Sequence, residues 1–227
     1  MRVHVAFTPG EPTPASVGIV VDVLRATSTM AQALAAGYRR VLCCAEIEEA
    51  RALAESEGPA RLAGERRLEH IEGFDFGNSP RELVGEPAAE TLILTTTNGT
   101  RLLVAAAARF EVVLVGSLLN LVAVAAAARE TGEDVAVLCA GVLGELALDD
   151  AYCAGRIVAL LDGDRSDAAK ASEVIAERFP NAIDGINART YGPPGLEEDI
   201  AWCSQVSVLD VVPRLSRMLE RAAEVTL

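Results

Sequence analysis

Short apolar runs rich in β-branched residues alternate with longer stretches of helical spacing, and this alternation limits the possible folds. Most of the runs are apolar on both faces, which is typical of strands in a sheet covered by helices on both sides. The predicted strands are Val3–Phe7, Val17–Val23, Val41–Cys44, Thr91–Thr95, Val112–Val115 and Val135–Cys139. The predicted helices are Thr27–Ala36, Ile47–Ser56, Thr100–Ala108, Leu119–Glu130, Leu146–Leu161, Ser166–Phe179 and Pro213–Ala223. We therefore predict a three-layer α/β/α fold around a mostly parallel sheet, with a mixed sheet as the alternative.

A chain of 227 residues without a Pro/Ser-rich linker fits a single α/β domain, which we predict for residues 1–227. Residues 17–60 and 91–131 share the order strand, helix, strand, and an offset of 72 places Val41 over Val113. Two unrelated β-α-β units would match as well, so an internal duplication and a shared architecture both stay open. The stretch Gly58–Pro87 is the least regular, and its length makes it a candidate functional loop.

The net charge of the chain limits the classes of molecule that it can bind. The sequence has 20 Lys and Arg residues against 33 Asp and Glu residues, a net charge of −13. The electrostatic field of this negative charge repels phosphodiester backbones and anionic lipids, so we expect no nucleic-acid partner and no membrane partner. The sequence shows no signal peptide and no apolar run of the roughly 18 residues that suggest a membrane span. Five cysteines without a C-x-x-C pair indicate reduced thiols, so we expect a cytoplasmic protein.

Asp22 lies at the carboxyl end of the second predicted strand, and hydroxyl residues then open a helix. In open α/β sheets, ligands bind beyond the carboxyl ends of the strands. A carboxylate at that place suits Mg²⁺, and helix-opening N–H groups with hydroxyls such as that of Ser28 suit phosphate oxygens. Arg25 lies between the two residues. The alternative is a strand-end aspartate followed by an ordinary helix cap.

A second polar turn follows the predicted strand Thr91–Thr95. Gly99 allows a tight turn or a close approach to a ligand, and Asn98 and Thr100 offer hydrogen-bond donors. Arg101 offers a planar fork that matches phosphate or sulfonate oxygens. A capped turn beside a surface arginine is the alternative.

The irregular stretch contains a mixture of groups that a purely structural loop rarely needs. Glu65 and Arg66 come first, and Asp75 and Asn78 follow in a segment that also contains glycines. We interpret these four residues as candidates for binding a metal or a substrate.

Two later segments contribute further acidic residues. Glu145 and Asp149 are four residues apart, which places them on one helix face, and Asp150 follows directly. One or both of Glu145 and Asp149 could complete a magnesium site, although negative charge at a helix N-terminus is also simply stabilising. Asp199 is interpreted as a cap or a salt-bridge partner, and Trp202 as a core residue.

Standard catalytic signatures are missing from the sequence. It contains no G-x-x-x-x-G-K-[ST] loop, no G-x-G-x-x-G turn and no G-x-S-x-G elbow. Generic motifs alone therefore do not identify a hydrolase.

Six segments taken together resemble the 2-phosphosulfolactate phosphatase family. They are VVDVLRATSTMAQALAAG, GER, GFDFGNSP, TTTNGTR, LCAGVLGELALDDAYCAG and GLEEDIAWCSQ, and the resemblance runs from Val20 to Pro213. It implies a three-layer α/β fold and Mg²⁺-dependent hydrolysis of (R)-2-phospho-3-sulfolactate to 3-sulfolactate and phosphate. In methanogens this step leads to coenzyme M. The positions that match are Asp22, Arg25, Ser28, Glu65, Arg66, Asp75, Asn78, Asn98, Gly99, Thr100, Arg101 and Asp149.

The resemblance, combined with side-chain chemistry, gives these residues three kinds of role. The expected catalytic residues are Asp22, Arg25, Ser28 and Arg101. The expected substrate-binding residues are Arg66, Asn78, Asn98, Gly99 and Thr100. The expected Mg²⁺ ligands are Asp22 together with members of the set Glu65, Asp75 and Asp149.

The nucleophile stays open between a metal-activated water, Asp22 and Ser28. We favour water, because no histidine is placed to serve as the base of a serine. In one motif the chain departs from the family, since Asp149 stands where a glutamate is expected and its shorter side chain changes the reach to a metal.

Two other functions remain as alternatives to 2-phosphosulfolactate phosphatase activity. One is a phosphatase for another small phosphorylated 2-hydroxy acid, and the other is a non-catalytic anion-binding protein. If the chain is a phosphatase, its partner is a small anionic phosphorylated substrate. Exposed apolar helix faces would favour a homodimer.

Overall fold

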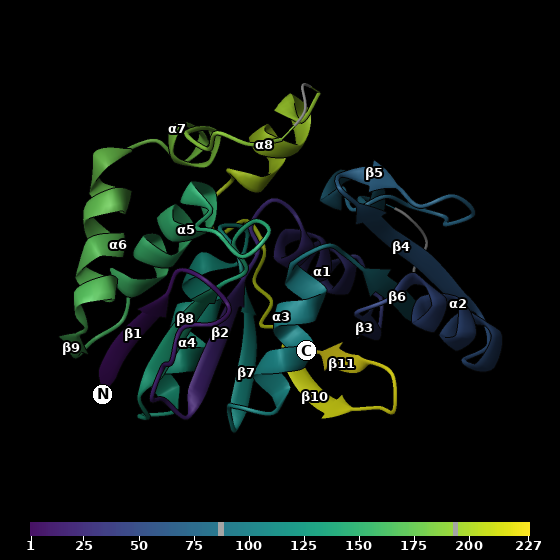
Figure 1. The fold of residues 1–227 in the computed structure, drawn as a ribbon, viewed down its shortest axis with the longest axis horizontal. Coiled ribbons are helices and arrows are strands. Elements are labelled where there is room, and N and C mark those ends of the chain that lie inside the picture. Colours follow the sequence, from purple (N-terminus) through teal and green to yellow (C-terminus); the bar gives the residue numbers. More distant parts are fainter. Residues whose placement is uncertain (86–88, 193–194) are drawn as a thin grey trace.

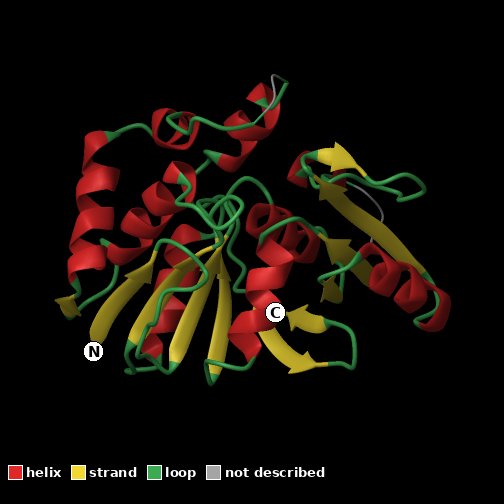
Figure 2. Ribbon diagram, in the orientation of Figure 1, coloured by secondary structure: helices red, strands yellow, loops and turns green. Residues whose placement is uncertain are grey.

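The computed structural model describes residues 1–85, 89–192 and 195–227, which form an 11-stranded sheet with helices on both faces (Figure 1 and Figure 2). The strands are β1 Arg2–Ala6, β2 Val17–Val21, β3 Arg40–Cys44, β4 Ala60–Arg66, β5 Glu69–His70, β6 Thr91–Thr95, β7 Val112–Gly116, β8 Val135–Cys139, β9 Asp164–Arg165, β10 Arg214–Met218 and β11 Ala223–Thr226. The helices are α1 Ala26–Ala35, α2 Ile47–Ser56, α3 Gly99–Ala107, α4 Leu121–Glu130, α5 Leu148–Val158, α6 Asp167–Arg178, α7 Ala182–Asn187 and α8 Glu197–Cys203, with a short 3-10 helix at Pro80–Leu83. The predicted three-layer α/β fold is confirmed, and the sheet is mixed.

The sheet consists of two parallel blocks joined by an antiparallel hairpin. One block has the order β4-β6-β3 and the other β7-β2-β8-β1-β9, with β11 and β10 between β3 and β7. Every pairing from β3 to β7 is antiparallel, so the two blocks run in opposite directions along the sheet. Among the described residues, β10 and β7 pair only at Arg214 and Leu114. The sheet turns at this short junction, and in Figure 1 the arrowheads of both blocks point toward the middle of the molecule.

Alternate strand residues face different helix layers. Ile19 and Val21 of β2 pack in one cluster with Ile157 of α5. Val20, between them, packs in a second cluster with Met30 of α1. Because β2 is buried on both faces, these contacts fix the turn that leads from β2 into α1.

One predicted helix is wrong. The residues of Pro213–Ala223 form β10 and the turn into β11, because Ala223 and Val225 are buried where β11 fills the gap beside β3. Glu224 accepts hydrogen bonds from Arg217 and Ser216, and these bonds hold the hairpin together. Pairing with a distant strand therefore outweighs local helical spacing.

Some elements of the fold were not predicted. The irregular stretch Gly58–Pro87 contains β4, which pairs with β6 from Ala60 to Gly64, while residues 86 and 87 lie outside the described part of the chain. The short helices α7 and α8 were not predicted either. None of the described helices is long and apolar enough to cross a membrane.

The structure leaves open whether residues 17–60 and 91–131 arose by internal duplication. The starts of β3 at Arg40 and β7 at Val112 are separated by the predicted offset, since 112 − 40 = 72. A shared β-α-β architecture would give the same spacing, so the coincidence does not separate the two explanations.

Candidate active site

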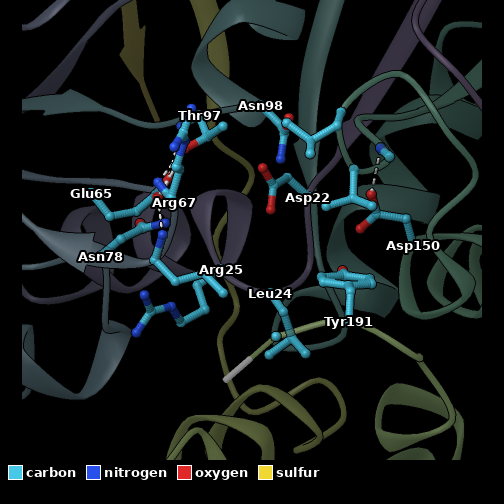
Figure 3. Close-up of a pocket in the computed structure, with 15 residues that line it drawn as sticks. Asp22, Leu24, Arg25, Glu65, Arg67, Asn78, Thr97, Asn98, Asp150 and Tyr191 are labelled. Carbon is cyan, nitrogen blue, oxygen red and sulfur yellow. Dashed lines mark hydrogen bonds between the residues drawn. The ribbon is translucent and has the colours of Figure 1, made fainter. Parts of the chain in front are cut away.

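A cavity of about 370 Å³ lies where the carboxyl ends of the two blocks meet (Figure 3). Segments that follow β2, β4, β6 and β8 line it, together with residues between α7 and α8. The lining residues are Asp22, Leu24, Arg25, Glu65, Arg67, Leu68, Asn78, Thr97, Asn98, Gly141, Val142, Leu143, Asp150, Tyr191 and Gly192. Three carboxylates and two guanidinium groups are the charged side chains on this described wall, so the cavity offers both signs of charge to a ligand.

Asp22 lies directly after β2, at the turn into α1. The N–H and the hydroxyl of Thr27 each donate to the Asp22 carbonyl oxygen at 2.9 Å. The Asp22 carboxylate accepts a hydrogen bond from the N–H of Ala26 at 3.4 Å. Gly99 permits this packing, because a Cβ atom at that position would lie 2.5 Å from Oδ2 of Asp22. In Figure 3 the Asn98 side chain points toward the Asp22 carboxylate, so both predicted polar turns meet at this residue.

The environment of Asp22 changes its acidity. Burial, together with the negative charges of Glu65 and Asp149, raises the pKa of Asp22 to about 7, although hydrogen bonds from the backbone of Ala26 and Gly99 lower it. Asp22 therefore changes between its protonated and ionised forms near neutral pH. A cation bound beside the carboxylate would favour the ionised form.

Two adjacent aspartates near the start of α5 have different surroundings. Asp150 lines the cavity, and its oxygens accept hydrogen bonds from the N–H of Val23 at 2.9 Å and of Gly141 at 3.0 Å. Asp149 is not a lining residue, and the hydroxyl of Tyr191 donates to its Oδ2 at 2.7 Å. Burial raises the pKa of both carboxyls. Asp150 thus connects the turns that follow β2 and β8 at the cavity wall.

Glu65 connects the end of β4 with the turn after β6. Its carboxylate accepts hydrogen bonds from the N–H of Thr97 at 2.7 Å, the hydroxyl of Thr97 at 2.9 Å and the N–H of Leu68 at 2.7 Å. The N–H of Arg67 donates to the same Thr97 hydroxyl at 3.1 Å. These bonds fix the backbone of Arg67 on the cavity wall.

Arg25 reaches from the turn after β2 toward α8. Its Nη1 lies 2.6 Å from Oδ2 of Asp199, and both side chains are buried. The hydroxyl of Ser79 donates to the other Asp199 oxygen. Within the described residues, Nε of Arg25 and Oδ1 of Asn78 are buried without a hydrogen-bond partner. Since buried polar atoms are normally satisfied, these two atoms indicate a place for a polar ligand or water.

Comparison with known proteins places the chain in a family. The sequence profile of the family described as 2-phosphosulpholactate phosphatase matches residues 5–218. The chain belongs to this family. The resemblance predicted from the six segments is therefore confirmed.

Curated relatives cover nearly the whole chain. It is 38% identical over 218 residues to a probable 2-phosphosulfolactate phosphatase of Caldanaerobacter subterraneus, covering 91% of this chain and 90% of that protein. It is 38% identical over 217 residues to the 2-phosphosulfolactate phosphatase of Methanothermobacter thermautotrophicus, covering 94% and 92%. A probable 2-phosphosulfolactate phosphatase of Thermus thermophilus is 37% identical over 226 residues, covering 95% and 94%.

The structure brings together only part of the residues that the family resemblance suggested. Asp22, Arg25, Glu65, Asn78 and Asn98 all line the cavity. They come from turns that are far apart in the sequence, and the arrangement of the two sheet blocks gathers them.

Two predicted hydroxyl residues are fully buried behind the wall. The Ser28 hydroxyl donates to the carbonyl oxygen of Val23 at 2.8 Å. The Thr100 hydroxyl accepts from the N–H of Thr96 at 3.0 Å. Neither residue lines the cavity, and both hydroxyls hold a strand-to-helix turn in place.

Two predicted charged residues have partners outside the cavity. Arg101 forms an ion pair with Glu46 at 2.8 Å. Asp75 forms an ion pair with Arg61 at 2.7 Å. Neither Arg101 nor Asp75 is a lining residue, so the structure does not bring them to the other candidates.

Arg66 and Arg67 differ from what the sequence suggested. Arg66 is not a lining residue, and its Nη2 donates to the Thr95 hydroxyl at 2.8 Å. Arg67 was not predicted, but it lines the cavity. Arg66 ends β4, whereas Arg67 lies in the turn between β4 and β5, where its positive φ interrupts the alternation of the strand. No motif in the sequence marked this turn, so Arg67 had no signal of its own.

Three other residues near the cavity were not assigned to the site from the sequence. Asp150 lines it in place of Asp149, and the adjacent acidic pair was the only signal for this choice. Tyr191 lies in none of the six motifs, and Asp199 lies in the last of them but was interpreted as a cap or a salt-bridge partner. Tyr191 lines the cavity and donates to Asp149, and Asp199 is connected to the cavity through its ion pair with Arg25.

The predicted Mg²⁺ ligands do not form one set. Among the described residues, no group of three or more His, Cys, Asp and Glu side chains is placed to hold a metal ion. Asp22 nevertheless fits a cation, because its carboxylate lies on the cavity wall. Burial and neighbouring negative charges raise its pKa, and a bound cation would offset both effects. Asn78 adds an amide oxygen without a partner among the described residues. Mg²⁺ usually binds proteins through one or two carboxylates, and waters and substrate phosphates fill its other positions.

Proposed function

We propose that the chain is a Mg²⁺-dependent phosphatase that hydrolyses (R)-2-phospho-3-sulfolactate to 3-sulfolactate and phosphate. The family and the names of the relatives support this reaction. The observation that carries it is the presence of Asp22 and Arg25 on one cavity wall, because these groups suit a metal ion and a phosphoryl group. Water attacks phosphorus, the bond from phosphorus to the C2 oxygen breaks, and this oxygen leaves with a proton.

The charge of the substrate explains why arginines line a cavity in an acidic protein. Phosphate, carboxylate and sulfonate together carry about three to four negative charges near neutral pH. The whole chain has a net charge of −13, so the substrate needs local positive charge. Arg25 supplies it in a buried place, where a charged hydrogen bond is stronger than at the surface. A volume of about 370 Å³ suits a small molecule.

We assign the steps of binding to particular side chains. Asp22, in its ionised form, would hold Mg²⁺, and Asn78 would offer a second ligand, since its amide oxygen has no partner among the described residues. When bound, Mg²⁺ neutralises phosphoryl charge and lowers the pKa of a bound water. Arg25 binds phosphoryl oxygens, and Asn98 orients the substrate beside Asp22. Water remains our preferred nucleophile, because the hydroxyl of Ser28 is buried behind the wall.

Phosphate release tests the proposal directly. The purified protein is incubated with racemic 2-phosphosulfolactate, 2-phospholactate and p-nitrophenyl phosphate, first with Mg²⁺ and then with EDTA. We expect release from 2-phosphosulfolactate that EDTA abolishes and that added Mg²⁺ restores. Release from 2-phospholactate alone would assign a different phosphorylated 2-hydroxy acid. No release from any compound by folded protein would overturn the phosphatase assignment and favour an anion-binding protein.

Three finer expectations accompany this function. A cytoplasmic location is supported by the cysteines, since all five are free and buried. The absence of nucleic-acid partners and the homodimer stay predictions. The link to coenzyme M synthesis is a property of the pathway in methanogens and also stays a prediction.

A further inference from the structure

The cavity wall carries two positively charged side chains with different surroundings. Within the described lining residues these are Arg25 and Arg67. Arg25 is buried and forms an ion pair with Asp199. Arg67 is exposed, and among the described residues its guanidinium has no ion-pair or hydrogen-bond partner. Arg25 is held in one orientation by Asp199 and still offers its unpartnered Nε to a ligand, whereas the guanidinium of Arg67 has no such restraint among the described residues.

The neighbouring carboxylate does not occupy Arg67. Glu65 is two residues away, but both of its oxygens accept hydrogen bonds from Thr97, and Oε2 also accepts one from the N–H of Leu68. Glu65 therefore holds the turn, and the Arg67 guanidinium keeps its donors for another acceptor.

The backbone at Arg67 is held in an unusual conformation. Arg67 has φ of 53° and Leu68 has φ of 71°, both in the left-handed region that residues with a Cβ atom rarely adopt. The hydrogen bond from the Arg67 N–H to Thr97 maintains this conformation. Positive φ at both positions is the ordinary geometry of a two-residue hairpin turn, here the turn between β4 and β5. In Figure 3, Arg67 and Arg25 lie on the same side of the cavity as Glu65, across from Asp150.

We propose that Arg67 is a specificity-determining residue that binds the second anionic group of the substrate, its sulfonate or its carboxylate, while Arg25 serves the phosphoryl group. This inference rests on the proposed function. A guanidinium presents two parallel N–H groups to two oxygens of either anion. A phosphate ester without a second anion gains nothing from Arg67, so the residue separates the physiological substrate class from simple phosphomonoesters.

The test compares Arg67→Ala with wild type on 2-phosphosulfolactate, 2-phospholactate and p-nitrophenyl phosphate. Loss of a charged, bidentate contact should lower kcat/KM for 2-phosphosulfolactate by about 10- to 100-fold, mainly through KM. Activity on p-nitrophenyl phosphate should stay within about twofold, because this ester has only the phosphoryl group. Arg67→Lys keeps the charge without the planar fork, so its loss on 2-phosphosulfolactate should be smaller.

The pattern across substrates identifies the anion. A loss on 2-phosphosulfolactate alone supports contact with the sulfonate, and a loss that includes 2-phospholactate supports contact with the carboxylate. Arg129→Ala is the matched control, because it removes one positive charge from an exposed position at the end of α4, outside the cavity. It should leave all three activities unchanged.

Several outcomes would overturn the inference. Equal losses on all three esters in folded Arg67→Ala would mean that Arg67 serves the phosphoryl group or the fold. Unchanged activity on all three would mean that it binds no part of the substrate. Either result leaves the proposed function intact, provided that wild type is active. Wild-type protein that hydrolyses none of the esters overturns the proposed function, and this inference with it.

Discussion

Arg25 and Asp199 form a buried ion pair, with 2.6 Å between Nη1 and Oδ2, although 174 positions separate them in the sequence. The pair connects the turn after β2 with α8. Ser79 donates a hydrogen bond to the second oxygen of Asp199, so the carboxylate is held from two sides. In this way a helix outside the sheet fixes the orientation of an arginine on the cavity wall.

Asp199→Asn should impair both stability and activity. Removing one member of a buried ion pair leaves an uncompensated charge and typically costs about 3–5 kcal/mol in the free energy of unfolding. We expect a loss at or below this range, because the amide retains the shape. The KM for 2-phosphosulfolactate should rise about tenfold, because Arg25 loses its fixed orientation. Urea unfolding and steady-state kinetics measure the two effects.

Two further variants make the Asp199 result specific. Asp199→Glu keeps the charge and should recover part of the activity. Asp184→Asn, at an exposed position of α7, should change neither quantity. Unchanged kinetics in Asp199→Asn would show that Arg25 does not depend on α8 for its position.

Gly99→Ala tests the contact between the two polar turns. A Cβ atom there would lie 2.5 Å from Oδ2 of Asp22 and 2.6 Å from Cβ of Ala26, closer than real Cβ contacts. Although alanine favours helices over glycine, we expect a loss of about 1–3 kcal/mol from overpacking. Activity should also fall, because Asp22 must move. Thermal unfolding and phosphate release measure both, and Gly10→Ala, with nothing within 4 Å, is the control. A Gly99→Ala protein as stable and active as wild type would contradict the close approach.

Sequence patterns predicted the parts of the fold that depend on local signals. The strand before Asp22 and the helix after it were predicted, because a continuous apolar run and a hydroxyl-rich helix start are both local features. The hairpin at Arg214–Thr226 was not, since its pairing with β3 and β7 exists only in the folded chain. The helical spacing of Leu215 and Leu219 is a local feature and contains no information about pairing with distant strands.

The candidate site was predicted in part for the same reason. The motifs located Asp22 because it directly follows β2, and Asn98 because it lies in the turn between β6 and α3. They also suggested Arg66 instead of Arg67, because the turn that places Arg67 at the cavity is defined by the pairing of β4 with β5 and by a contact with Thr97. The orientation of a side chain depends on such turns and on distant partners, of which the contact between Asp199 and Arg25 is an example.

Ser28→Ala separates a water nucleophile from a serine nucleophile. The Ser28 hydroxyl is fully buried and donates to the Val23 carbonyl oxygen at 2.8 Å, so it is not presented to the cavity. We expect a loss of about 1 kcal/mol in stability from the missing hydrogen bond and activity within a few-fold of wild type. Phosphate release and acid-quench trapping with labelled substrate give the answer. A stable phosphoserine, or a complete loss of turnover in folded protein, would identify Ser28 as the nucleophile.

Asp22→Asn should remove activity and make the metal-free protein more stable at high pH. The pKa of a free aspartate is 3.8, and burial raises that of Asp22 to about 7. Between these values the folded state keeps a proton that the unfolded state has lost, so the free energy of unfolding falls as pH rises. The contribution of Asp22 is fully present below pH 3.8 and is lost above about pH 7. In Asp22→Asn this decline should be shallower, although not absent, because the pKa values of Asp149 and Asp150 are also raised.

Urea unfolding in EDTA between about pH 4.5 and 8 measures how the free energy of unfolding falls with pH. The slope gives the difference in the number of bound protons between the folded and the unfolded state. Asp22→Asn should be the more stable protein at the upper end of the range, while phosphate release with Mg²⁺ is lost. Mg²⁺ should stabilise wild type by binding its folded state and should have little effect on the variant. Asp210→Asn, at an exposed position, is the control for the lost charge. The same pH slope in both proteins would show that Asp22 does not titrate as its buried position requires, and retained turnover would show that another group holds the metal.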